Sequence, residues 1–263
     1  MTRPTVYTHG HHESVLRSHR WRTVENSAGY LIPHLRQGLS LLDVGCGPGT
    51  ITADFAARLA PGRVRGIDAA TEVVAAAQRD YPGVAFGVDD VYRLQEADGS
   101  WDIVHAHQVL QHLANPVAAL TEMRRVVKPG GLVAARDVVY AACTWYPEDP
   151  RLDRWLALYD EVARANGGEP DAGKVLLSWA RRAGFTDVVA TTSSWCFATP
   201  ADRTWWGHLW ADRITSSAFG HQAVREGRAT AAELADIADA WRAWSAAEDG
   251  WFAMLHGEIV CRR

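Results

Sequence analysis

A glycine-rich segment beginning at Asp43 has residue types and spacing that suit the binding of a small polar ligand. It reads Asp43-Val44-Gly45-Cys46-Gly47-Pro48-Gly49-Thr50 and follows a short apolar run. Glycines let the backbone approach a ligand where a Cβ atom would clash. Thr50 stands where the third glycine of a dinucleotide fingerprint would fall, and Pro48 lacks an N–H that a pyrophosphate could use. The spacing therefore argues against a nicotinamide dinucleotide.

Acidic residues follow the next two apolar runs. Asp68 ends the second run, about 20 residues beyond the glycines, where a carboxylate is placed to bind ribose hydroxyls. Asp89-Asp90 follows the third run. An aspartate at the end of a strand is often only a helix cap. Three such features on successive strand ends of one sheet edge favour a shared ligand site instead.

Two further groups could act on a proton. Tyr7, His11 and His12 lie near the N-terminus, and histidine has an unperturbed pKa of about 6.5, which suits a donor or base. A solvated, histidine-rich helix start is the alternative, and the spacing does not favour a metal site. Arg136-Asp137 ends the fifth predicted strand, so Asp137 is a candidate to orient a ring N–H or hydroxyl. A simple salt bridge at the sheet edge remains the alternative.

Aromatic residues are abundant, with 12 tryptophans in 263 residues. Aromatic walls hold flat, apolar ligands, although most such residues could equally form a core. The candidate substrate-binding residues, together with Arg136, are Trp145, Tyr146, Trp195, Trp206 and Trp210.

The elements that must position these residues alternate between strands and helices. This pattern predicts βαβ units, a mostly parallel sheet and an α/β fold. The predicted strands are 39–45, 63–68, 84–88, 101–107, 132–139, 186–199 and 251–261. The predicted helices are 11–35, 49–60, 71–80, 116–128, 152–165 and 173–183, with helical pattern through 200–249.

Composition narrows the class of protein. The chain is 48% hydrophobic and 22% charged, which is typical of a globular protein, and its net charge of −4 does not suit a nucleic-acid binder. No window approaches the roughly 18 apolar residues of a membrane span, and the start lacks the apolar core of a signal peptide. The four cysteines lie far apart, without CxxC spacing. We expect a cytoplasmic monomer or homodimer that acts on a small molecule and holds no metal.

Five segments carry a resemblance to a known family: LLDVGCGPGT, VRGID, VDDVYRL, WDIVHAHQVLQHL and VVKPGGLVAARD. They resemble class I S-adenosylmethionine-dependent methyltransferases, particularly the menaquinone/ubiquinone C-methyltransferase-like group. The resemblance covers residues 40–140 well and 171–198 loosely. It implies a Rossmann-like, seven-stranded, mostly parallel sheet with helices on both faces and an antiparallel last strand. We expect an N-terminal helical lid (1–38), a cofactor-binding core (39–199), a helical insertion contributing to the acceptor pocket (200–249) and the last core strand (250–263).

The resemblance also implies roles for single residues. Gly45 and Gly47 would pass under the methionine part of the cofactor, and Asp43 would support its amino group. Asp68 would bind the ribose hydroxyls. The remaining implied cofactor-binding residues are Ala69 beside the ribose, Asp90 and Val91 at the adenine, and His107 and Gln108 at the amino-acid end. Asp89 departs from the family, which usually has glycine there.

The resemblance predicts an enzyme that transfers a methyl group from S-adenosyl-L-methionine and leaves S-adenosyl-L-homocysteine. The start YTHGHH and the aromatic insertion are similar to bacterial enzymes of secondary metabolism that methylate carbon 3 of indole in tryptophan-containing cyclic dipeptides, giving a pyrroloindoline. Methylation of a phenol or amine, C-methylation of a quinone precursor and a non-enzymatic cofactor-binding module remain the alternatives. The stacking rings would come from residues 195–210, and the proton acceptor from Asp137 or the N-terminal cluster.

Overall fold

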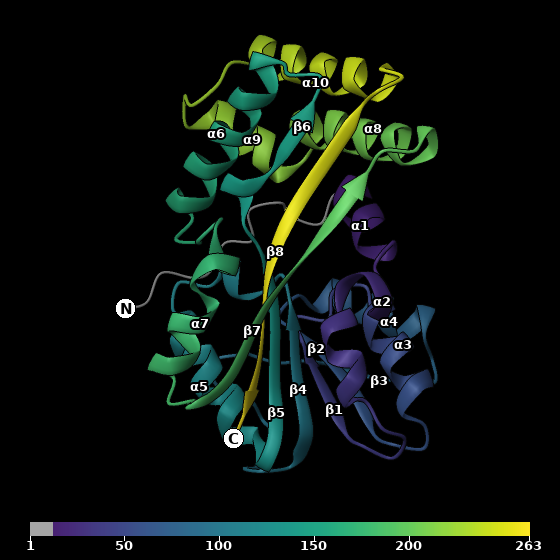
Figure 1. Cartoon of the computed structure of the whole chain (residues 1–263), viewed down its shortest axis with the longest axis vertical. Coiled ribbons are helices and arrows are strands. Elements are labelled where there is room, and N and C mark those ends of the chain that lie inside the picture. The colour runs from purple at the N-terminus through teal and green to yellow at the C-terminus, as the bar shows by residue number, and fades with distance from the viewer. Residues whose placement is uncertain (1–12) are drawn as a thin grey trace.

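The computed structural model describes residues 13–263 and shows a twisted sheet below a second, helical layer (Figure 1). The sheet contains strands β1 to β8. Their bounds are β1 (Leu41–Val44), β2 (Val64–Asp68), β3 (Ala85–Val88), β4 (Trp101–His107), β5 (Val127–Val138), β6 (Thr144–Tyr146), β7 (Asp187–Phe197) and β8 (Trp251–Arg262).

The strand order agrees with the sheet that the resemblance implies. It runs β3-β2-β1-β4-β5-β8-β6, with β7 also paired to β8. The first five strands are parallel, whereas β8 is antiparallel to both β5 and β7. The predicted α/β fold with an antiparallel last strand is confirmed. The short strand β6, which pairs with the start of β8, was not predicted and gives an eighth strand.

Helices cover both faces of the sheet. Their bounds are α1 (Glu13–Arg20), α2 (Val24–Ser27), α3 (Thr50–Leu59), α4 (Thr71–Asp80), α5 (Pro116–Val126), α6 (Pro150–Ala165), α7 (Ala172–Arg182), α8 (Pro200–Ser216), α9 (Ala218–Arg225) and α10 (Ala231–Ala246), with 3-10 turns η1 (Gly29–His34), η2 (Leu110–His112) and η3 (Tyr140–Ala142). All four residues of β1 are buried, as expected for a strand covered on two sides.

The two covered faces have separate cores. On one face, α2, η1 and α3 pack on the sheet through Val24, Leu31 and Phe55. On the other face, α5 and α7 pack through residues such as Leu120 and Leu176. Because neighbouring residues on one strand point to opposite faces, they contact different cores.

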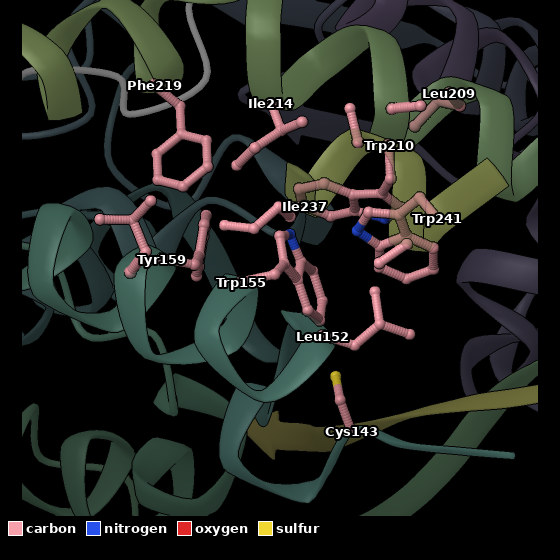
Figure 2. Close-up of a cluster of buried hydrophobic side chains, with 14 of the residues drawn as sticks. Cys143, Leu152, Trp155, Tyr159, Leu209, Trp210, Ile214, Phe219, Ile237 and Trp241 are labelled. Carbon is pink, nitrogen blue, oxygen red and sulfur yellow. The ribbon is translucent and has the colours of Figure 1, made fainter. Parts of the chain in front are cut away.

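The predicted insertion 200–249 forms α8, α9 and α10. These helices share one buried aromatic cluster with α6, the end of β7 and the start of β8. Within it, the Trp155 ring meets the Trp210 and Trp241 rings edge to face, at centroid distances of 4.6 and 5.0 Å (Figure 2). The helical layer therefore includes α6, which the sequence analysis assigned to the core 39–199.

The single helix predicted over 11–35 is wrong for the described part of that range. The structure has α1, then α2, then η1. Thr23 interrupts the helix, because its hydroxyl accepts a hydrogen bond from the Asn26 backbone N–H while Asn26 caps the Thr23 N–H in return. Pro33 lies within η1. The apolar residues read as one helical face are thus shared between short elements.

Candidate active site

A cavity of about 880 Å³ lies at the carboxyl edge of the sheet, between the strand ends, the α1–α2 segment and the helical layer. Loops after β1, β2, β3 and β4 all contribute to its wall. This is the edge where open α/β sheets bind ligands. Its volume lies in the upper part of the range for ligand pockets.

The loop after β1 lies open toward this cavity because its glycines adopt conformations that other residues avoid. Gly45 and Gly47 have φ of 66° and 55°. A Cβ on Gly45 would also overlap the Val109 side chain, so the loop could not take this path with alanine. Both glycines line the cavity, as does Pro48. Both glycines of the predicted loop therefore lie at the cavity.

Asp43 and Asp68 line the cavity beside this loop. The Asp68 carboxylate accepts hydrogen bonds from the backbone N–H groups of Gly47 (3.1 Å) and Ala70 (3.0 Å). Asp43 is buried and accepts from the Thr52 hydroxyl at 2.6 Å. Asp68 therefore fixes the glycine loop and still presents lone pairs to a ligand.

The other implied cofactor residues also reach the wall. They are Ala69, Asp90, Val91, His107 and Gln108. Asp89, where the family usually has glycine, is buried. Its carboxylate accepts hydrogen bonds from the backbone N–H groups of Asp90 (2.9 Å) and Gln95 (3.1 Å). Asp89 thus holds the turn after β3 in place.

The end of β4 carries unusual backbone geometry. Gln108 has φ of 53°, the only positive φ of a non-glycine residue within 13–263. Its side chain accepts from the Arg22 guanidinium at 2.7 Å and donates to His256 Nε2 at 2.9 Å. Such strain persists only where surrounding contacts fix it, and it is frequent at functional sites. Gln108 therefore links the N-terminal segment to β8 across the cavity edge.

An aromatic wall closes the cavity on the side of the helical layer. Trp195, Trp206 and Trp210 all line it, together with Tyr140. Trp206 stacks on Phe197 at 4.2 Å between ring centroids, and Trp195 Nε1 donates to the Asn26 carbonyl at 2.6 Å. The rings are thus held by their own packing.

The pair Arg136-Asp137 does not line this cavity. Successive residues on β5 point to opposite faces, so the two cannot share one site. The Arg136 Nε donates to Ser193 (3.1 Å) and Glu258 (3.3 Å) under the N-terminal segment. Asp137 lies fully buried on the other face, where it accepts from the Gln111 backbone N–H at 3.1 Å. Burial raises the pKa of Asp137 to about 8.

Two of the predicted aromatic residues also lie elsewhere. Trp145 stacks on Phe252 at the edge of the helical layer, at a centroid distance of 6.3 Å. Tyr146 is 54% exposed. Both belong to β6, whose pairing with β8 holds them away from the cavity wall. Neither is placed to contact an acceptor in this cavity.

The N-terminal candidates Tyr7, His11 and His12 lie outside the described residues. The described part of the predicted lid does reach the cavity, through Ser18, His19 and Arg22. The His19 carbonyl accepts from the Thr50 hydroxyl at 3.1 Å. The end of α1 is thus tied to the glycine loop.

Several cavity residues had no sequence signal. They include Ser18, Arg22, Asn115, Tyr140, Arg213 and Met254. None belongs to the glycine loop or a strand-end acid, and each reaches the cavity only through tertiary packing. His112 also lines the wall.

Comparisons with known proteins agree with the fold. Residues 42–135 match the family model described as "Methyltransferase domain". An uncharacterised methyltransferase of Schizosaccharomyces pombe is 32% identical, covering 100% of this chain and 99% of its own. A probable methyltransferase, LtbC of Aspergillus luteorubrus, is 30% identical over 97% of this chain and 96% of its own.

A solved structure with the same fold is phosphoethanolamine N-methyltransferase 2 of Haemonchus contortus, in complex with phosphomonomethylethanolamine and S-adenosylhomocysteine. Its TM-score is 0.54 at 16% identity, and the match covers 87% of this chain and 49% of that one. The family model, together with this fold, defines the class of S-adenosylmethionine-dependent enzymes. The full-length relatives then show that this chain belongs to the methyltransferase family.

The residues present fit the cofactor. A glycine cradle that a Cβ would obstruct lies beside the Asp68 carboxylate, which is suited to vicinal hydroxyls. The bound cofactor supplies an electrophilic methyl group on a positively charged sulfur. The surrounding protein must orient the acceptor and exclude water. Within 13–263, no helix combines the length and apolarity needed to cross a membrane.

Proposed function

We propose that this methyltransferase acts on a small, flat aromatic molecule of secondary metabolism. The specific acceptor that we propose is carbon 3 of the indole in a tryptophan-containing cyclic dipeptide. The observation that carries the proposal is the wall of Trp195, Trp206 and Trp210, which faces the same cavity as the glycine loop. Aromatic faces stack with a flat ring and also favour the positive charge of the sulfonium.

The charge distribution supports a carbon nucleophile. An indole attacks through its π-system, so no strong base is needed before methyl transfer. The carboxylate predicted as a base, Asp137, lies on the opposite face of β5 and its neutral form is favoured by burial. The carboxylates lining the cavity are Asp43 in β1, Asp68 at the end of β2, and Asp89 and Asp90 after β3. None of them belongs to β7 or α8, which carry the aromatic wall, so we propose an acceptor that needs no carboxylate base.

The subgroup, the cell compartment and the oligomeric state are further parts of this proposal. The menaquinone-like subgroup is supported by a demethylmenaquinone methyltransferase of Beutenbergia cavernae, 33% identical over 52% of this chain. The free cysteines of the chain, of which Cys46, Cys143 and Cys261 are buried, suit a reducing cytoplasm. We propose a monomer or homodimer whose partners are small molecules and not nucleic acid.

Mass spectrometry tests the acceptor directly. The protein is incubated with methyl-labelled S-adenosylmethionine and a panel of tryptophan cyclic dipeptides, simple indoles, catechols, aromatic amines and a menaquinone precursor. We expect a gain of one methyl group on the cyclic dipeptides, with a product ring system that lacks indole absorbance. Methylation of only the catechols, amines or quinone precursor would overturn the indole proposal.

A matched pair of variants links the reaction to the aromatic wall. Trp206→Ala removes a ring from the cavity, whereas Trp244→Ala removes a buried ring that does not line it. We expect the first change to raise the acceptor KM much more than the second. Equal effects on acceptor KM would show that the wall does not bind the acceptor.

A further inference from the structure

Three histidines lie on one face of the sheet near its carboxyl edge, and two of them have hydrogen-bond partners. His105 Nδ1 lies 2.8 Å from the Asp43 carboxylate. His256 lies with Nδ1 3.1 Å from the Met254 carbonyl and Nε2 2.9 Å from the Gln108 amide. These contacts assign His256 a neutral ring with the proton on Nδ1, because Nδ1 must donate to the carbonyl. His256 is therefore fully engaged in holding Gln108.

His107 is different. It ends β4, it is 5% exposed, and neither ring nitrogen has a hydrogen-bond partner within 13–263. A buried polar group without a partner is rare and destabilises the fold, so it calls for an explanation. The ring lines the cavity next to Gln108 and within 5.8 Å, centroid to centroid, of Trp195. It therefore lies between the glycine loop and the aromatic wall.

We propose that His107 is a catalytic residue that takes the proton released by the acceptor after methyl transfer. The proposal rests on the proposed function only in that an acceptor stacks against Trp195. The carbon–sulfur bond breaks with its electron pair going to sulfur, and the nucleophile forms the new bond to the methyl carbon. The acceptor then carries the positive charge. For the indole, the neighbouring amide nitrogen forms a bond to carbon 2, the π pair of the C=N⁺ bond moves to the ring nitrogen, and the amide N–H bond breaks; for a phenol or amine, the O–H or N–H bond breaks. In each case the electron pair of the broken bond stays on the acceptor, and the proton moves to a His107 nitrogen.

The surroundings keep the free imidazole neutral and able to accept a proton. Burial is the largest cause that lowers the pKa of His107 well below its usual value. The electrostatic effects of Arg22 in the α1–α2 turn, Arg136 in β5, His256 in β8 and His105 in β4 lower this pKa further. Such a ring is a weak base. It suffices here because the methylated acceptor is itself a cation and a strong acid. The total charge in the cavity stays constant, since the imidazolium replaces the sulfonium.

The first test is chemical rescue. His107→Ala is compared with the wild type in single-turnover reactions with whichever acceptor the panel identifies, with and without added imidazole. We expect the rate at which the deprotonated product appears to fall ~100- to 1,000-fold in the variant, typical of a removed general base, with partial recovery on adding imidazole. Both proteins are saturated with S-adenosylmethionine, so that a change in cofactor affinity does not enter this rate. An unchanged rate of appearance of the deprotonated product, or a lost rate that imidazole does not restore, overturns the proposal.

A second readout does not depend on turnover. In protein with ¹⁵N-labelled histidine, the His107 nitrogens should shift when acceptor is added to the complex with S-adenosylhomocysteine, whereas the His256 nitrogens should barely move. If His107→Ala fails to fold, His107→Gln takes its place in both tests. His208→Gln, which changes an exposed histidine, is the matched control variant. If the acceptor proves to be a phenol instead of an indole, both tests still apply, so failure of one proposal is distinguishable from failure of the other.

Discussion

The Asp68 carboxylate has two tasks, because it caps the glycine loop and faces the ligand cavity. We expect Asp68→Ala to weaken binding of S-adenosylhomocysteine by roughly 10- to 100-fold, the equivalent of about 1.5–3 kcal/mol for hydrogen bonds to a charged group. Isothermal titration measures the change. Asp68→Asn, which keeps one side-chain oxygen as an acceptor, should lose less affinity than Asp68→Ala. Unchanged affinity in a folded Asp68→Ala protein would remove the ribose assignment.

Asp137 makes stability depend on pH. Its folded-state pKa of about 8 lies above the unfolded value, so the native state holds a proton that the unfolded state has lost between about pH 4 and 8. Stability should therefore fall as pH rises through this window. We expect Asp137→Asn, which cannot ionise, to gain roughly 1 kcal/mol per pH unit relative to the wild type. Urea unfolding at pH 5, 6, 7 and 8 measures this, and parallel curves for the two proteins would contradict it.

Gln108 permits a separation of strain from hydrogen bonding. Both Gln108→Gly and Gln108→Ala remove the bridge between Arg22 and His256, but only glycine relieves the positive φ. We expect the glycine variant to be about 1 kcal/mol more stable than the alanine variant, with both losing activity. Thermal unfolding of the pair tests this. Equal stability would mean that the backbone relaxes when the side chain is lost.

Single residues show where sequence reasoning succeeds and where it does not. The positions of Gly45, Gly47 and Asp68 at the cavity could be predicted because they depend on backbone geometry and on the end of a strand. Arg136 and Asp137 were predicted to serve one acceptor site, although neighbouring residues on a strand point to opposite faces. Which of the two faces which helices is a property of the packed sheet. The sequence could not show that the His107 ring nitrogens lack hydrogen-bond partners in the described part of the chain, because the side chains packed around this ring come from other elements.

At the scale of elements, strand and helix positions in 39–138 were predicted closely because each has a clear apolar period and a glycine or proline boundary. The sequence did not reveal β6, whose three residues are too few to show a period. The helix predicted over 11–35 was wrong because the capping pair Thr23 and Asn26 was overlooked. Local hydrogen bonds there outweigh the apolar pattern.

The helical layer should depend on its buried tryptophans for stability and on its cavity-facing tryptophans for recognition. Trp241 is fully buried, contacts Trp155 and Trp210, and does not line the cavity. We expect Trp241→Ala to cost about 3–5 kcal/mol of unfolding free energy. Trp206→Phe keeps a stacked ring and should cost much less stability while altering acceptor KM. Urea unfolding and steady-state kinetics on both variants check this contrast; comparable losses of stability would contradict it.

For the whole molecule, α1 is the element that connects the helical layer to the cofactor edge of the sheet. On one side, Arg17 forms an ion pair with Asp212 at 2.9 Å, and Arg213 donates to the Ser18 hydroxyl at 2.8 Å. On the other side, His19 accepts from Thr50, and Arg22 binds Gln108. Both halves of the cavity therefore contact one short helix and its following turn (Figure 1).

Occupation of the cofactor site should therefore slow the opening of this segment. Ser18, His19 and Arg22 line the cavity, so a ligand on the glycine loop adds contacts that exist only in the closed state. We expect S-adenosylhomocysteine to reduce hydrogen exchange in peptides covering 13–23 at least tenfold, measured by mass spectrometry. Arg22→Met should lose most of this protection, because the tie to Gln108 is gone, whereas Arg36→Met, on the exposed end of the same region, should keep it. If exchange in 13–23 does not change on binding, the segment does not close over the cofactor, and access to the cavity must be controlled elsewhere.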